Sequence, residues 1–280
     1  MALIILVVAP FVIAESRVPD RPTLDVPGAI TVTGGLLAAV YAIVEQSLLV
    51  GCVGIVLLAA FWLIELRTPV PLVPVRILKR PTVKWGNYAG LVVFSMETAM
   101  IFLMTLYLQR ILGLSPFVTG LVFGVPGLAA VLAGPIAGRL IGRYGYRTVL
   151  VTGMATHSLA TVPLIFIGPS RPSLIVLIPA LLIGFYGHVT SIVAYTVTGT
   201  SGLPDGEQGL ATGFTSMTQQ VAITIGIPVL GAIAAAGSSE LTGIRVALTV
   251  GVIVTWASIV LVWIGLQSPA AVRADEPGPV

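Results

Sequence analysis

Glu97 is the residue of this sequence whose type and position most clearly suggest chemistry. It is the only acidic or basic side chain near the middle of a long apolar segment, which covers residues 86–108. If that segment spans a bilayer, a charge at its centre costs on the order of 3 kcal/mol and should face a cavity or a partner rather than lipid. Two interpretations follow: a carboxylate that binds a proton or a cation, or a structural glutamate that is hydrogen-bonded and does not titrate.

Polar side chains also recur at helical spacing near residue 190. Gly184, His188, Ser191 and Tyr195 are separated by steps of four, three and four residues, which places them on one face of a helix. His188 has the one side chain type that titrates near neutral pH, and histidines also serve simply to hydrogen-bond one helix to another. Both readings of His188 stay open.

A second polar stripe lies about 25 residues further along the chain. It consists of Thr212, Thr215, Ser216 and Gln219. Such stripes line a water-filled pathway or hold helices together, and both roles keep them away from lipid. We favour a pathway, so the cavity-lining candidates are His188, Ser191, Tyr195, Thr212, Ser216 and Gln219. His157 shares a small-residue face with Gly153 and Thr161, which favours helix packing.

The composition identifies the elements that must position these residues. Of 280 residues, 56% are hydrophobic and only 9% are charged, whereas soluble domains carry about 25% charged residues. Nine apolar segments follow one another, at residues 2–14, 26–41, 47–64, 86–108, 116–138, 148–168, 172–198, 209–236 and 244–266. About 20 residues of helix cross a bilayer, so the last eight segments predict an all-α, polytopic helical membrane protein. The first segment is shorter and resembles the end of a helix.

Small residues and prolines mark the segment at 116–138. The pairs Gly120-x-x-x-Gly124 and Gly134-x-x-x-Gly138 predict that a neighbouring backbone approaches closely. Pro126 and Pro135 each remove a helical hydrogen bond and favour kinks. Tight packing explains this pattern, and so does a helix that rocks as a pathway opens.

Basic residues predict the orientation in the membrane. If alternate loops share a side, 11 of the 14 lysines and arginines lie on one side and only Arg110, Arg171 and Arg245 on the other. Cytoplasmic loops are the ones that carry excess basic residues, so we expect a multi-pass protein of the inner (plasma) membrane with a cytoplasmic C-terminus. The basic residues sit in short loops, which argues against a nucleic-acid partner.

Motifs for other chemistry are missing from the sequence. There is no G-x-x-x-x-G-K-S/T phosphate loop, no H-E-x-x-H zinc helix and no G-x-S-x-G serine elbow. The single cysteine, Cys52, excludes an internal disulfide and a cysteine-rich metal site. We therefore expect no cofactor, no metal and no enzymatic activity, although Glu97 and His188 could in principle form an acid–base pair.

A loop signature points to a known family. The stretch from Gly138 to Arg147 reads GRLIGRYGYR and resembles the G-x-L-x-D-R-x-G-x-R signature of the major facilitator superfamily, in its second-half copy. The residues that carry the match are Gly138, Arg139, Arg143, Gly145 and Arg147. The acidic position of the signature is Gly142 here, so a charge relay through that aspartate does not carry over.

Further stretches resemble one branch, the fourteen-helix drug:proton antiporters of the EmrB/QacA type. They are Asp25-x-Pro27-Gly28, Glu65-Leu66-Arg67 with Pro71-Leu72-Val73-Pro74, Gln109-Arg110 with Gly113-x-Ser115-Pro116, and Gly209-Leu210-Ala211-Thr212-Gly213 with Gln219. Each motif is weak alone, but together they keep the order and spacing of the branch.

The resemblance implies a C-terminal portion of such a pump. It implies a partial helix at 1–14, an extra central helix pair at 26–64, a cytoplasmic linker at 65–85, a six-helix transporter half at 86–267 and a disordered cytoplasmic tail at 268–280. The substrate site of such transporters lies between two halves, so Glu97, His188, Ser191, Tyr195 and Gln219 would face it, and His157 would lie in the outer layer.

The expected function is proton-coupled efflux of multiple drugs or small molecules by alternating access, with Glu97 as the proton-coupling candidate. The expected partners are the lipid bilayer, a small-molecule substrate, protons and an N-terminal half that is missing or separately encoded. A truncated membrane remnant without transport is the main alternative, and an intramembrane enzyme that uses His188 and Glu97 is the second.

Overall fold

The computed structural model describes residues 25–68 and 75–266, and every described segment of regular structure is helical. Eight of these helices are long and apolar enough to cross a membrane. The long helices are α2 (Val26–Val44), α3 (Leu48–Glu65), α5 (Pro81–Leu106), α6 (Pro116–Tyr144), α7 (Tyr146–Thr161), α8 (Leu174–Thr200), α9 (Asp205–Ala235) and α10 (Glu240–Gly265). This confirms the all-α, polytopic fold class. The first apolar segment and the C-terminal tail lie outside the described residues.

Local signals in the sequence explain where several helices begin. The side chain of Asp25 accepts a hydrogen bond from the backbone N–H of Gly28 at 2.9 Å, and Pro27 occupies the first turn of α2. In the same way Ser115 accepts from the N–H of Val118 at 3.3 Å ahead of Pro116 in α6. A capping side chain satisfies an N–H that lacks a partner within the helix, and proline fits the first turn.

The polar stretch between α3 and α5 contains prolines at residues 69, 71, 74 and 81, of which only Pro81 lies among the described residues. A short helix, α4 (Val75–Leu78), precedes α5. Helix α5 begins at Pro81, five residues earlier than its apolar core indicates, because proline is suited to a first helical turn. The connection between the apolar segments at 172–198 and 209–236 is also shorter than their bounds indicate, since α8 continues to Thr200 and α9 begins at Asp205.

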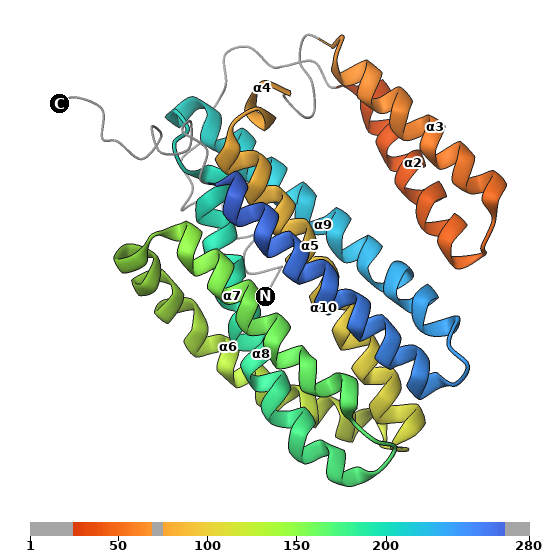
Figure 1. Ribbon diagram of the computed structural model, residues 1–280. Helices are drawn as coiled ribbons and strands as arrows, with labels where there is room; N and C mark the ends of the chain where they lie inside the picture. The colour runs from red at the N-terminus through yellow and green to blue at the C-terminus, as the bar shows by residue number, and fades with distance from the viewer. Residues whose placement is uncertain (1–24, 69–74, 267–280) are drawn as a thin grey trace, which may run out of the picture.

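Six helices, α5 to α10, form one bundle, and the α2–α3 hairpin lies at its edge beside α9 (Figure 1). Within the bundle α5 is the most completely buried span, and it packs against α8, α9 and α10. The hairpin is mostly exposed, which suits helices that face lipid. The bundle therefore positions the polar residues of α5, α7 and α8.

The glycines that bring helices together are not the ones that the sequence pattern selects. An added Cβ at Gly120, Gly124, Gly134 or Gly138 would meet nothing within 4 Å, so the close approach predicted for α6 is wrong for this bundle. These glycines lie on a side of α6 that no described helix covers. Near the site the backbones of α7 and α8 approach closely, since a Cβ on Gly187 would lie 2.6 Å from the backbone nitrogen of His157.

The loop signature forms a tight turn that connects α6 to α7. Helix α6 ends at Tyr144, and Gly145 turns the chain with a φ of 78°, a conformation that glycine adopts without strain. The guanidinium carbon of Arg147 then lies 3.6 Å from the ring centroid of Trp263, near the end of α10. Arg147 thus connects the start of α7 to α10 through a cation–π contact rather than extending into solvent.

Replacing Arg147 by Ala is expected to lower the free energy of unfolding by about 1 kcal/mol, because a cation–π contact of this kind is worth roughly 0.5–2 kcal/mol. Denaturation of the purified protein in detergent, followed by tryptophan fluorescence, measures the change. The matched control is Arg139→Ala, which removes an exposed arginine of the same loop signature and should alter stability little. Equal losses in both variants would contradict a specific role for the Arg147–Trp263 contact.

Candidate functional site

Glu97 lies in the interior of the six-helix bundle and is only 4% exposed. Its Oε2 atom is 3.4 Å from Nδ1 of His157 on α7 and 3.8 Å from Nδ1 of His188 on α8. The rings of the two histidines have centroids 5.9 Å apart. These are both histidines of the chain and its only acid in mid-span. We call Glu97, His157 and His188 the buried cluster.

The buried cluster lies at one depth in the bundle. Each member is within three residues of the middle of its own span, in the spans Pro81–Ile111, Tyr146–Phe166 and Arg171–Thr200. Helices that cross the same layer bring their midpoints to the same level, so this shared position is the sequence signal that could have revealed the cluster. The expectation that His157 serves only packing in an outer layer overlooked it.

Close packing of α7 on α8 fixes the position of His157. Because Gly187 has no side chain, the two backbones approach, and Nδ1 of His157 lies 3.2 Å from the carbonyl oxygen of Gly184. A carbonyl can only accept, so this contact holds the proton of the neutral ring on Nδ1. The Nδ1–H of His157 therefore donates to α8, and Oε2 of Glu97 lies 3.4 Å from the same nitrogen.

The polar atoms at the centre of the buried cluster have few protein partners. The two carboxyl oxygens of Glu97 make no hydrogen bond with any described residue, and the same is true of Nδ1 of His188. A buried charge without partners is costly, which makes an electrically neutral cluster the stable form. Neutrality requires one proton shared among the three groups: a carboxylic acid beside two neutral imidazoles, or a carboxylate beside one imidazolium.

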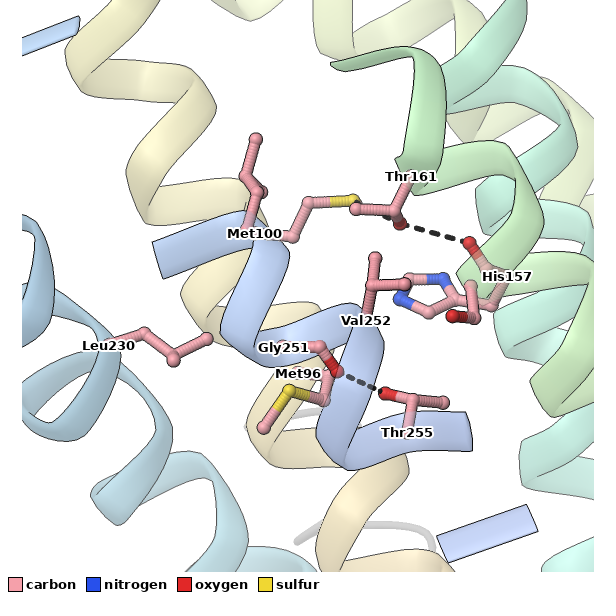
Figure 2. A pocket seen from close by; sticks show the side chains of 10 residues that line it. Met96, Met100, His157, Thr161, Leu230, Gly251, Val252 and Thr255 are labelled. Atoms are coloured by element: carbon pink, nitrogen blue, oxygen red, sulfur yellow. Dashed lines mark hydrogen bonds between the residues drawn. The ribbon is translucent and has the colours of Figure 1, made fainter. Parts of the chain in front are cut away.

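A small cavity adjoins His157 (Figure 2). Its volume is about 20 Å³, which suffices for one water molecule. Side chains from α5, α7, α9 and α10 line it, and its polar members are His157, Ser158, Thr161 and Thr255. The hydroxyl of Ser158 is buried and has no hydrogen-bond partner among the described residues. His157 thus lies between this cavity and Glu97.

The other polar residues of α8 are also buried. The hydroxyl of Tyr195 donates to the backbone oxygen of Thr215 on α9 at 2.6 Å, and Ser191 donates to the carbonyl of Gly187 within its own helix at 2.9 Å. Ser191 and Tyr195 are 0% and 2% exposed. Tyr195 thus joins α8 to α9, Ser191 is hydrogen-bonded within α8, and neither side chain borders an open surface.

The polar residues of the α9 stripe differ in their exposure. Thr212 and Ser216 are exposed, Gln219 is half-buried, and Thr215 is turned inward and buried. The exposed members lie on a side of α9 that no described helix covers. Of the expected cavity-lining residues, Thr212 and Ser216 are the ones that are exposed.

Comparison with known proteins identifies the class to which this bundle belongs. The model of the Major Facilitator Superfamily matches residues 1–227. The chain therefore belongs to the major facilitator superfamily and is a multi-pass membrane protein of a transporter family.

Relatives with names that describe drug resistance or export support this class. The puromycin resistance protein pur8 of Streptomyces alboniger is 30% identical over 94% of this chain and 58% of its own length. The cephamycin export protein CmcT of Amycolatopsis lactamdurans is 29% identical over 92% and 56%, and the multidrug resistance protein Stp of Mycobacterium tuberculosis is 28% identical over 76% and 41%. The chain spans about half the length of the curated relatives it matches.

The family also bears on the enzyme alternative. An intramembrane enzyme would require an acid–base pair, and Nδ1 of His188 does lie 3.8 Å from Oε2 of Glu97. Membership of the major facilitator superfamily nevertheless points to a transporter rather than an enzyme.

Proposed function

We propose that this chain is the C-terminal portion of a proton-coupled drug exporter of the fourteen-helix branch, working by alternating access in the plasma membrane. Its family and the resistance and export names of its relatives support export of small organic molecules. The observation that carries proton coupling is the burial of Glu97 in mid-span, against two histidines. A change of one unit of charge in such surroundings biases the equilibrium between two conformations.

A second six-helix unit completes the proposed substrate pathway. The described bundle leaves sides of α6 and α9 uncovered, with the glycines of α6 and the hydroxyls of Thr212 and Ser216 on them. In transporters of this architecture, substrate binds between two such units near the middle of the membrane. We assign Thr212, Ser216 and Gln219 to that wall, and place His188, Ser191 and Tyr195 directly behind it.

Dye efflux in cells tests the proposed function. One strain expresses the chain alone, and a second expresses it joined to the upstream coding sequence or together with a separately encoded N-terminal half. We expect efflux that collapses with the proton gradient in the second strain only. Efflux by the chain alone would contradict the need for a second unit. Absence of efflux in both strains would favour the alternative of a non-transporting remnant.

The proposed orientation places the C-terminus in the cytoplasm. Of the basic residues in the described segments, eight belong to the expected cytoplasmic side and three to the opposite side. The eight are Arg67, Arg76, Lys79, Arg80, Lys84, Arg139, Arg143 and Arg147, and the three are Arg110, Arg171 and Arg245. A reporter that fluoresces only in the cytoplasm, fused after Val280, is expected to be bright. A reporter active only in the periplasm provides the complementary reading, and its activity at that position would overturn the proposed topology.

A further inference from the structure

We propose that Glu97, His157 and His188 act as one proton-binding unit, which holds a single proton between them inside the bundle, apart from the substrate wall. This inference rests on the proposed function, because it identifies the partners and the location of the proton that would drive export. It goes further in assigning both histidines of the chain to that proton.

Burial separates the buried cluster from the substrate wall. Residues of an open wall should be accessible in the described bundle, as Thr212 and Ser216 are. Glu97, His157 and His188 are 4%, 6% and 8% exposed even so. Proton and substrate would therefore occupy different atoms, and the proton would influence export through the packing of α5, α7 and α8 rather than by direct competition.

The helix segments around the buried cluster supply few charged groups, so the three members must balance electric charge among themselves. Between Gln208 and Ser239, which covers α9 after its first turn, and between Arg245 and Leu266, which covers most of α10, the sequence contains no acidic, basic or histidine residue. Within the span Pro81–Ile111 the nearest charged side chains to Glu97 in sequence are Lys84 and Arg110, each more than three helical turns away. The neighbouring Tyr195 phenol is already committed to the carbonyl of Thr215.

Distances within the buried cluster suit a shared proton. Both imidazole Nδ1 atoms are within 4 Å of the same carboxyl oxygen, so a small shift brings either one into hydrogen-bond range. The step involves only a proton: the O–H bond of Glu97 breaks as an N–H bond forms on His188, and the product is a carboxylate beside an imidazolium. His157, held by the carbonyl of Gly184, is the third member of the unit and the one that borders the water-sized cavity.

Nitrogen NMR of the full chain provides a direct test, because its only two histidines both belong to the buried cluster. Protein labelled with ¹⁵N in histidine alone, in lipid nanodiscs, gives imidazole signals from no other site. His157→Gln and His188→Gln assign the signals. We expect the two histidines to titrate together, and Glu97→Gln to move their midpoints by at least about one pH unit, as for directly interacting groups.

The matched control is Glu45→Gln, which makes the same chemical change at an exposed position in the turn after α2 and should leave both signals unchanged. Thermal unfolding of each variant verifies that the bundle is folded. Identical histidine titrations in the wild type and Glu97→Gln would overturn the shared proton.

This test separates two kinds of failure. Loss of efflux in Glu97→Gln with unchanged histidine signals would leave the proposed function standing without the shared proton. Altered histidine signals with intact proton-driven efflux would leave the buried cluster as a proton site and remove it from export.

Discussion

Replacing Glu97 by Gln is expected to abolish the proton-driven part of drug efflux. Glutamine keeps the size and the hydrogen-bonding capacity of the side chain, but it cannot change charge, so the protonation step no longer distinguishes the two access states. Coupling free energies between sites are typically 1–3 kcal/mol, which corresponds to about 5–150-fold. We therefore expect the dye gradient maintained by the assembled pump to fall by roughly tenfold or more. Dye accumulation, measured with and without a proton ionophore, provides the value.

The Glu97→Gln experiment needs a variant with the same chemical change elsewhere. Glu45→Gln serves this purpose, because Glu45 is exposed between α2 and α3 and contacts no part of the buried cluster. Its efflux should equal that of the wild type. Facilitated dye movement down its own gradient should survive in Glu97→Gln if the substrate wall is intact. Proton-driven efflux at the wild-type level in Glu97→Gln would remove this residue from the mechanism.

Replacing Gly187 by Ala is expected to destabilise the bundle at the place where α7 crosses α8. The new methyl group would lie 2.6 Å from the backbone nitrogen of His157 and 2.8 Å from the carbonyl oxygen of Gly153. Backbone atoms cannot rotate away as side chains can, so the helices must separate. Overpacking of this kind costs about 1–3 kcal/mol, and the better helix propensity of alanine recovers less than about 1 kcal/mol. We expect the free energy of unfolding to fall by about 2 kcal/mol.

Gly124→Ala provides the matched substitution for this measurement. A Cβ at Gly124 on α6 meets no atom within 4 Å, so its only effect should be the gain in helix propensity. Thermal or denaturant unfolding in detergent should place Gly187→Ala well below the wild type and Gly124→Ala at or slightly above it. Comparable stability of the two alanine variants would show that α7 and α8 are packed less closely than the structure indicates.

Much of the fold is encoded in features that are local in the sequence. The length of each apolar run predicts a span, and Asp25 with Pro27 predicts the start of α2, because capping depends on residues three positions apart. Such signals act within one helix and need no knowledge of its neighbours. They locate the eight described spans, with differences of a few residues at positions such as Pro81.

The contacts between helices could not be predicted in the same way. Hydropathy does not specify which neighbour a helix face will meet. The glycine pairs of α6 therefore indicated a crossing point, whereas Gly153 and Gly187 lie where α7 and α8 approach closely. Glu97 was recognisable because an acid in mid-span is costly wherever it points. His157 was not, because a histidine becomes informative only when the fold brings it to a carboxylate.

The depth of Glu97 has a consequence for energetics. It lies one residue past the midpoint of the span Pro81–Ile111, so a proton that arrives there from either side has crossed about half of the electric field of the membrane. Moving a full charge through 100 mV is worth about 2.3 kcal/mol, and half of that path is worth about 1 kcal/mol. If the buried cluster holds the proton, its occupancy responds to membrane voltage as well as to acidity, and a cell with a strong potential but no pH difference could still load it.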